Sequence, residues 1–308
     1  MATRAGAGRL PLWLALTLGA ALLQTWRTAL QQRLRGRFSV GTAGFVRYLY
    51  AMPVGMVLVA GALLLRGGPL PHIGWRFVLA CAAGGLAQVI GTSLLIMAFG
   101  FRNFTVGTAY AKTDAVQAAL LGAVLLHETL SWGAWAGIGL GLAGVQTLSL
   151  AGQNRATMLR ASLQPAALCG IGAGAGFALA GVAIKYAVGT TNSSDVVLAA
   201  LCALVVTNTL QTLMQGSWMA WREPAGLRAA FTGWRSAMWV GVLSGLGSAG
   251  WFTAFSLAPV ALVRTAGQAD MVFTLLFSRF YLREQLRRSD VLGLVLMVGG
   301  VITVLLFH

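Results

Sequence analysis

Four ionisable side chains lie deep inside long apolar segments of this chain, where an isolated charge is energetically expensive. They are Lys112, Asp114, Arg264 and Asp270. A charged group left against lipid costs about 2.5–3.5 kcal/mol on membrane-insertion scales, so such groups pair with one another or face a water-filled cavity. Two cations and two carboxylates can bind an ionic substrate, carry a proton or form ion pairs. We predict that all four contact one polar cavity.

Helical spacing places further polar residues beside these charges. Tyr110, Asp114 and Gln117 are spaced i, i+4 and i+7, which puts them on one face of a helix. Arg264 and Gln268 align in the same way, at i and i+4. Each of the two faces is therefore a candidate substrate-binding surface.

A structural alternative for the four charges is a buried salt bridge, either Lys112 with Asp270 or Arg264 with Asp114. Pairing and function are compatible, because a pair that opens when a substrate arrives works as a gate. On a continuous helix, Asp270 would point away from Arg264. Asp114 and Asp270 are also the candidates for carrying a coupling proton, since burial favours the neutral form of a carboxyl group.

Five further residues are candidates for the same site, each with a competing explanation. Gln24 and Arg27 lie on one polar stripe, and Arg27 and Arg47 lie near segment ends that share a loop, where long side chains also reach the headgroups. Gln88 is a single amide among apolar residues. It either makes a hydrogen bond that packs two helices together or contacts the substrate. Trp251 either lines a pocket or lies in the interfacial or lipid-facing positions common for tryptophan.

The composition indicates an integral membrane protein. The chain is 57% hydrophobic and 9% charged, with a mean hydropathy of +0.77, whereas a soluble domain is about 25% charged. The cysteines are isolated and no spacing typical of a metal or catalytic site occurs, so we expect neither an enzyme nor a cofactor. The net charge of +15 is clustered between apolar segments, which indicates contacts with lipid headgroups and not with nucleic acid.

Ten segments are apolar over about 20 residues, the length that crosses a bilayer. We expect these spans at 11–32, 41–66, 76–99, 104–126, 132–151, 165–187, 195–218, 234–257, 260–282 and 289–307. Pro53 should kink the second span. The segment 221–228 is predicted to be a loop.

The second half of the chain repeats the first. At a shift of 156 residues Asp114 matches Asp270 and Glu128 matches Glu284, without a gap. We expect the two glutamates, which close their spans, to anchor helix ends. Five spans per half is an odd number, so the second half must enter the membrane upside down.

These observations predict an all-α integral membrane fold with ten transmembrane helices in two inverted five-helix repeats. The first repeat is expected at 1–151, a connecting loop at 152–164 and the second repeat at 165–308.

Each half combines a short turn, an apolar helix closed by a glutamate and a glycine-rich last span. The residues that carry this pattern run from Ala98 through Asp114 to Glu128, and from Ala258 through Asp270 to Glu284. In this pattern the chain resembles the drug/metabolite transporter superfamily, in particular its ten-span EamA-type members, over nearly its whole length. The resemblance implies a cavity between the halves near mid-membrane, lined largely by spans one, three, four, six, eight and nine.

Cations outnumber acids inside the spans, with Arg27, Arg47, Lys112 and Arg264 against Asp114 and Asp270. Fixed positive charge favours a substrate that bears a carboxylate. We therefore predict a secondary transporter that moves an amino acid or organic acid by alternating access, as an exporter or exchanger. The alternatives are a proton-coupled exporter of cationic or lipophilic drugs and a lipid-headgroup flippase.

The loops also predict location and orientation. We expect a multi-pass protein of the inner (plasma) membrane of a bacterium, working as a monomer whose partners are its substrate and membrane lipids. Because Lys and Arg accumulate on the cytoplasmic side of membrane proteins, we predict that both termini face away from the cytoplasm, whereas members of the resembled family usually place them inside it. Loops after odd-numbered spans hold Arg33, Arg35, Arg37, Arg102, Arg155, Arg160, Arg222, Arg228, Arg235, Arg283, Arg287 and Arg288, while the other side holds Arg4, Arg9, Arg66, Arg76 and Lys185.

Overall fold

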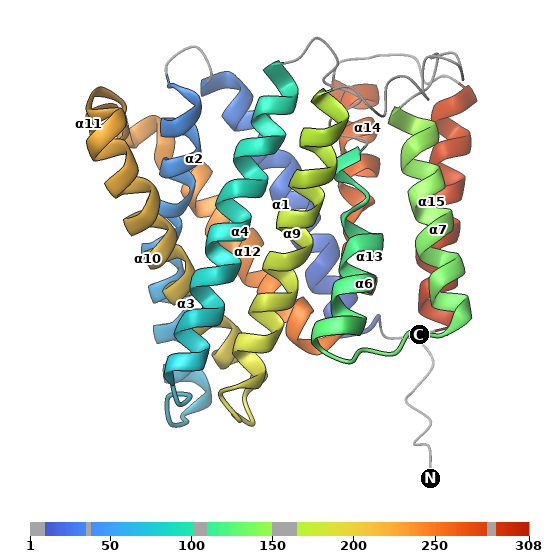
Figure 1. The fold of residues 1–308 in the computed structure, drawn as a ribbon, viewed down its shortest axis with the longest axis horizontal. Helices are drawn as coiled ribbons and strands as arrows, with labels where there is room; N and C mark the ends of the chain where they lie inside the picture. The colour runs from blue at the N-terminus through green and yellow to red at the C-terminus, as the bar shows by residue number, and fades with distance from the viewer. Residues whose placement is uncertain (1–9, 35–37, 101–109, 150–164, 282–287, 308) are drawn as a thin grey trace.

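The computed structural model describes residues 10–34, 38–100, 110–149, 165–281 and 288–307, and every regular element within these ranges is a helix. The helices lie side by side in one bundle (Figure 1). A helix satisfies its backbone hydrogen bonds internally, which is what a chain in hydrocarbon requires.

Within the described ranges, each expected span coincides with one helix or with two consecutive helices. The first half contains α1 (Leu12–Leu34), α2 (Val40–Leu49), α3 (Ala51–Arg66), α4 (Trp75–Gly100), α6 (Asp114–Leu125) and α7 (Trp132–Ser149). The second half contains α9 (Pro165–Gly189), α10 (Val196–Arg222), α11 (Pro224–Thr232), α12 (Trp234–Leu257), α13 (Val260–Gly267), α14 (Ala269–Tyr281) and α15 (Arg288–Phe307). Within the described residues, the stretches long and apolar enough to cross a membrane are Gly41–Arg66, Trp75–Ala98, Pro165–Gly189, Val196–Arg222 and Trp234–Leu257.

Three spans are interrupted in the described part of the chain, and only the interruption of the second, at Pro53, was predicted from the sequence. The second span breaks at Tyr50, between α2 and α3, because Pro53 has no N–H to donate to the carbonyl of Leu49. The ninth span breaks at Gln268, between α13 and α14. In the fourth span, α6 begins only at Asp114, after a turn. The prediction of a loop at 221–228 was wrong, since α11 occupies most of it.

The two halves run in opposite directions. In Figure 1, α1 begins and α15 ends at the lower end of the bundle, whereas α9 begins at the upper end. The turns at 67–74 and 190–195 also lie at the lower end, and α11 lies at the upper end. This arrangement agrees with the inverted repeat, because five spans return the chain to the opposite side.

Glycines let the last helices of the two halves pack against each other. A Cβ added at Gly144 of α7 would lie 2.7 Å from the carbonyl oxygen of Gly293, and one at Gly137 would lie 2.8 Å from that of Gly300. Such contacts are too short for any side chain, so only glycine permits this approach of α7 and α15. The two helices form a pair at one side of the bundle, to the right in Figure 1.

Candidate functional site

The two repeated aspartates begin helices that follow interruptions of their spans. Asp114 is the first residue of α6, and Asp270 lies in the first turn of α14. The hydroxyl of Thr113 donates to the carbonyl of Tyr110 at 2.6 Å. This side-chain bond competes with the backbone hydrogen bonds that would continue a helix through the residues just before Asp114. Free N–H groups and the helix dipole favour a negative charge at a helix N-terminus. The sequence repeat therefore corresponds to a repeated backbone feature, a broken span with a carboxylate at the start of its second part.

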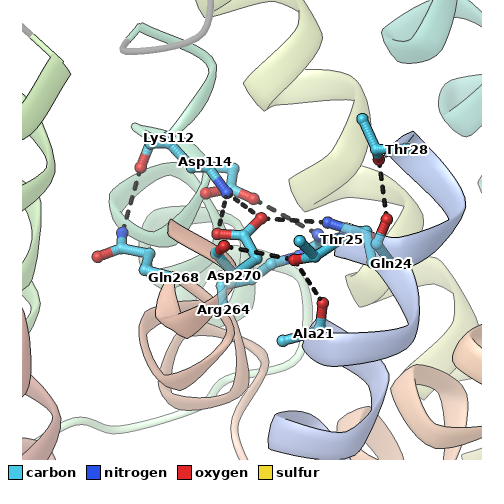
Figure 2. Close-up of polar contacts among 9 residues, drawn as sticks. All are labelled: Ala21, Gln24, Thr25, Thr28, Lys112, Asp114, Arg264, Gln268 and Asp270. Carbon is cyan, nitrogen blue, oxygen red and sulfur yellow. Dashed lines mark hydrogen bonds and ion pairs between the residues drawn. The ribbon is translucent and has the colours of Figure 1, made fainter. Parts of the chain in front are cut away.

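Asp270 is held by contacts from three residues in two spans (Figure 2). The ammonium of Lys112 lies 2.5 Å from its Oδ2 and 2.8 Å from its Oδ1. From α1, Gln24 donates to Oδ2 at 3.3 Å, and the hydroxyl of Thr25 donates to the carbonyl of Asp270 at 3.3 Å. This carboxylate is thus tied to both the first and the fourth span.

Arg264 forms the second ion pair and is surrounded by aromatic rings. Its Nη1 lies 3.4 Å from Oδ2 of Asp114, and its Nη2 donates to the carbonyl of Phe177 in α9 at 2.6 Å. The guanidinium also lies over the rings of Trp251 and Phe255, 5.6 and 4.9 Å from their centroids. Cation–π attraction stabilises a guanidinium in such a position.

The Arg264–Asp114 pair is the less complete of the two. Among the described residues, Oδ1 of Asp114 and Nε of Arg264 have no hydrogen-bond partner, although both atoms are buried. A buried polar atom without a partner costs about 1–3 kcal/mol. The pair therefore leaves one acceptor atom and one donor atom without a side-chain partner in the described part of the chain.

Gln268 connects the two interrupted spans. It lies at the break between α13 and α14 and donates from Nε2 to the carbonyl of Lys112 at 3.4 Å (Figure 2). The two breaks, which correspond to each other in the repeat, therefore face each other across the interface between the halves. Both ion pairs considered from the sequence are present at this junction, Lys112 with Asp270 and Arg264 with Asp114.

Arg27 lies close enough to Arg47 for the two positive charges to repel each other, and it is attracted electrostatically by Asp270. Arg47 is 9% exposed, so it is packed inside the bundle and does not extend outward from it. Beside them Tyr48 is buried, and neither its Oη nor Nε of Arg27 has a hydrogen-bond partner among the described residues. No carboxylate in the described ranges forms an ion pair with either arginine.

The remaining candidates lie next to the cluster or away from it. Gln117 donates to Thr113 at 2.8 Å and to the carbonyl of Ile171 in α9 at 3.3 Å. Tyr110 contributes its carbonyl to the turn before α6. Gln88 is removed from the cluster, because its Oε1 accepts from Gln211 of α10 at 2.8 Å.

Several polar residues of the interior were not selected from the sequence. Thr25 and Tyr48 are neighbours of selected residues, and their hydroxyls could have been found by examining the same helix turns. Asn208 and Gln211, both buried in α10, are spaced i and i+3 inside an apolar span, which is a signal of the kind used for Gln24 and Arg27. No group of three His, Cys, Asp or Glu side chains that could hold a metal occurs in the described part of the chain.

A second set of ion pairs lies at the lower end of the bundle. Glu128, just after α6, lies 2.5 Å from Lys185 of α9, which also donates to the carbonyl of Ala258 at 2.8 Å. This corresponds to the anchoring role predicted for Glu128, with lysine as the partner, whereas Glu284 lies outside the described residues. An open hollow of about 450 Å³ adjoins the pair.

Arg66 at the end of α3 and Asp195 before α10 form the other pair at this end, at 2.9 Å. Asp195 also caps α10, since its Oδ1 accepts from the backbone N–H of Leu198 at 3.0 Å. That backbone bond, and then the nearby Arg66 guanidinium, hold the pKa of the Asp195 carboxyl below its ordinary value. Desolvation opposes this shift.

Known proteins of similar sequence and structure agree with this architecture. A segment of 68 residues, 21% of this chain, is 34% identical to NIPA-like protein 2 of Mus musculus, of which it covers 18%. A solved crystal structure, described only as that of a protein, superposes with a TM-score of 0.67 at 20% identity, over 96% of this chain and 99% of the other. The EamA-like transporter family matches residues 11–150 and again residues 164–306. The chain is a multi-pass membrane protein and belongs to the EamA-like transporter family.

Proposed function

We propose that this transporter moves a small metabolite bearing a carboxylate, an amino acid or organic acid, by alternating access between two five-helix halves. The proposal rests on one observation, the unequal pairing of the buried charges. Asp114 and Asp270 each form an ion pair with a cation, whereas neither Arg27 nor Arg47 forms an ion pair with a carboxylate in the described ranges. An anionic group placed between them would receive charge-assisted hydrogen bonds.

The broken spans supply the moving part of this proposal. Opening the Arg264–Asp114 pair would release a guanidinium toward the substrate and leave Asp114 to take a proton. The two interrupted spans meet at the hydrogen bond from Gln268 to the carbonyl of Lys112, so a change in one ion pair would be transmitted to the other through this contact. We propose export or exchange as the mode, with Asp114 or Asp270 as the proton carrier.

A cationic drug as substrate is less well supported by the same charges. Such a drug needs an available carboxylate, and both buried aspartates are already in ion pairs. A flippase for lipid headgroups would use the basic loops, most of which lie outside the described residues. We propose that the protein acts as a monomer in the inner membrane of a bacterium, with lipids around it.

A thermal-shift screen on the purified protein tests the substrate class. We expect amino acids or organic acids to raise the melting temperature, and the corresponding amides, which lack the carboxylate charge, to lose the effect. Arg27→Gln and Arg47→Gln should weaken binding of an active carboxylate at least tenfold, whereas Arg76→Gln, at the exposed start of α4, should not. Stabilisation by cationic drugs and by no carboxylate would overturn the proposal.

Reporter fusions after His308 test the orientation. With both termini facing away from the cytoplasm, a reporter active only in the periplasm should give signal and one active only in the cytoplasm should not. The opposite result would mean that the usual family orientation holds despite the arginine-rich loops after the odd-numbered spans.

A further inference from the structure

The inner face of α10 carries a stripe of uncharged polar side chains. Asn208, Gln211 and Gln215 are spaced i, i+3 and i+7, and Asn208 lies near the midpoint of this 27-residue helix. Asn208 is 4% exposed and Gln211 is fully buried. Amides at this depth in a bilayer are unfavourable unless all of their donors and acceptors are satisfied.

The hydrogen bonds of the stripe are only half complete. Nε2 of Gln211 donates to Oε1 of Gln88 at 2.8 Å and to the carbonyl of Gly85 at 3.1 Å, both in α4. Its Oε1 has no partner among the described residues, and the same holds for Nδ2 of Asn208 and Oγ1 of Thr92, one turn after Gln88. A role in helix packing alone would account for the bonds to α4 but not for these free atoms.

The atoms without a partner include both hydrogen-bond donors and acceptors. Asn208 offers a donor, Gln211 an acceptor, and the Thr92 hydroxyl can act as either. None of the side chains in the stripe is charged. The chemistry that satisfies them is a neutral group that both accepts and donates, such as a hydroxyl or a carboxamide.

Helix α9 contacts both the charged cluster and α4, the helix that pairs with the stripe. Arg264 donates to the carbonyl of Phe177, near the midpoint of α9. The ring of Phe177 packs on Gly91 of α4, where a Cβ would lie 3.3 Å from it. Gly91 follows Gln88 by about one turn, so Phe177 packs on the part of α4 next to Gln88.

We propose that Asn208 and Gln211, with Gln88 and Thr92, form a second subsite that binds a neutral hydrogen-bonding group of the substrate. The inference rests on the proposed function for the carboxylate end of that substrate. It narrows the substrate class to carboxylates that also carry a hydroxyl or carboxamide, because a purely hydrocarbon substituent would leave the buried amides unsatisfied.

Cysteine accessibility tests whether the stripe faces water. On a background lacking Cys81, Cys169 and Cys202, Asn208→Cys and Gln211→Cys should react with a hydrophilic methanethiosulfonate reagent in membranes. Leu213→Cys, on the outward face of the same helix and 61% exposed, serves as the lipid-facing control and should remain unmodified. The melting temperature of each variant identifies any that fails to fold. An inert cysteine at both 208 and 211 in folded protein would show dry packing and overturn the inference.

Matched ligands test the chemistry. Serine against alanine, malate against succinate and glutamine against norleucine differ in a neutral polar group while keeping their carboxylates. We expect the polar member of at least one pair to bind tenfold or more tightly, and Asn208→Leu and Gln211→Leu to remove that preference. Equal binding within every pair would overturn the second subsite and leave the proposed function intact. Binding of no carboxylate at all would overturn the proposed function, while the labelling result would still decide the inference.

Discussion

The ion pairs of the central cluster and those of the lower end join the same two halves of the chain in different surroundings. In the cluster, the paired side chains of Lys112 with Asp270 and of Arg264 with Asp114 are between 11 and 17% exposed. At the lower end, Arg66 and its partner are 53 and 28% exposed. In the Lys185–Glu128 pair, Lys185 is 24% exposed, whereas Glu128, at 10%, is as buried as the residues of the central cluster.

The difference in burial decides which ion pairs can open. An exposed pair can separate into water, whereas a buried pair opens only if another charged group replaces the lost partner. Breaking a buried pair by removing one partner costs about 3–5 kcal/mol, because the remaining charge is left uncompensated. An exposed pair contributes about 0–1 kcal/mol, since water solvates both charges when they separate. Motion of the halves can therefore open the Arg66–Asp195 pair without a ligand, whereas the central pairs must exchange one partner for another charge.

The largest expected effect is that of removing a partner in the centre. Asp114→Asn leaves the Arg264 guanidinium without its carboxylate and should lower the free energy of unfolding by about 3–5 kcal/mol. Transport in proteoliposomes should fall to background. Combining it with Arg264→Gln should restore much of the stability, measured by the unfolding midpoint in detergent, but not the transport. Near-normal transport by both single variants would remove the cluster from the mechanism.

Exchanging the charges of Lys112 and Asp270 tests whether the charges themselves or the surrounding hydrogen bonds stabilise the central cluster. Lys112→Asp with Asp270→Lys keeps opposite charges together but puts a cation in the first turn of α14. The helix dipole disfavours that charge, so the double variant should be less stable than the original by about 1–2 kcal/mol. Each single variant should be less stable than the double. A double variant as unstable as the singles would indicate that Gln24 and Thr25, and not the ion pair, hold this junction.

A smaller effect is expected where Glu128 meets Lys185. Glu128→Gln should weaken the contact by about 1 kcal/mol, which corresponds to roughly a fivefold change in a two-state population. We expect a change of this size in transport rate, together with greater labelling of a cysteine introduced at Thr190 beside the adjoining hollow. Unchanged labelling would show that this end does not open through the Glu128 contact.

The smallest effect is expected at Arg66 and Asp195. Arg66→Gln should lower stability by about 0.2–1 kcal/mol at neutral pH. The folded-state pKa of Asp195 is depressed, so its contribution is present above the unfolded value of about 3.9 and is lost as the pH falls through the folded pKa. The difference between Arg66→Gln and the original protein should therefore vanish below that pKa. A difference that persists in acid would mean that Arg66 acts through other contacts.

The membrane class, the limits of most spans and the internal repeat could be predicted from the sequence, because each depends on apolar length or on residue identity at a constant shift. The same reasoning identified Lys112, Asp114, Arg264 and Asp270, since a charge inside an apolar span stands out without any structure. Pro53 also indicated the interruption of the second span, which lies at Tyr50. The break at Gln268 and helix α11 were not predicted, because hydropathy does not report backbone geometry.

Which residues meet was decided by the tertiary structure. The sequence left two pairings open, and both are present because the breaks before Asp114 and Asp270 bring the starts of α6 and α14 together, 156 residues apart in the chain. Gln88 was a candidate by residue type alone, and its bond to Gln211 places it on another face of the interior. Residue types and spacing determined by themselves which side chains must be sheltered from lipid. Only the packing of helices distant in sequence decided which of them shelter one another, because that depends on how the two inverted halves fit together.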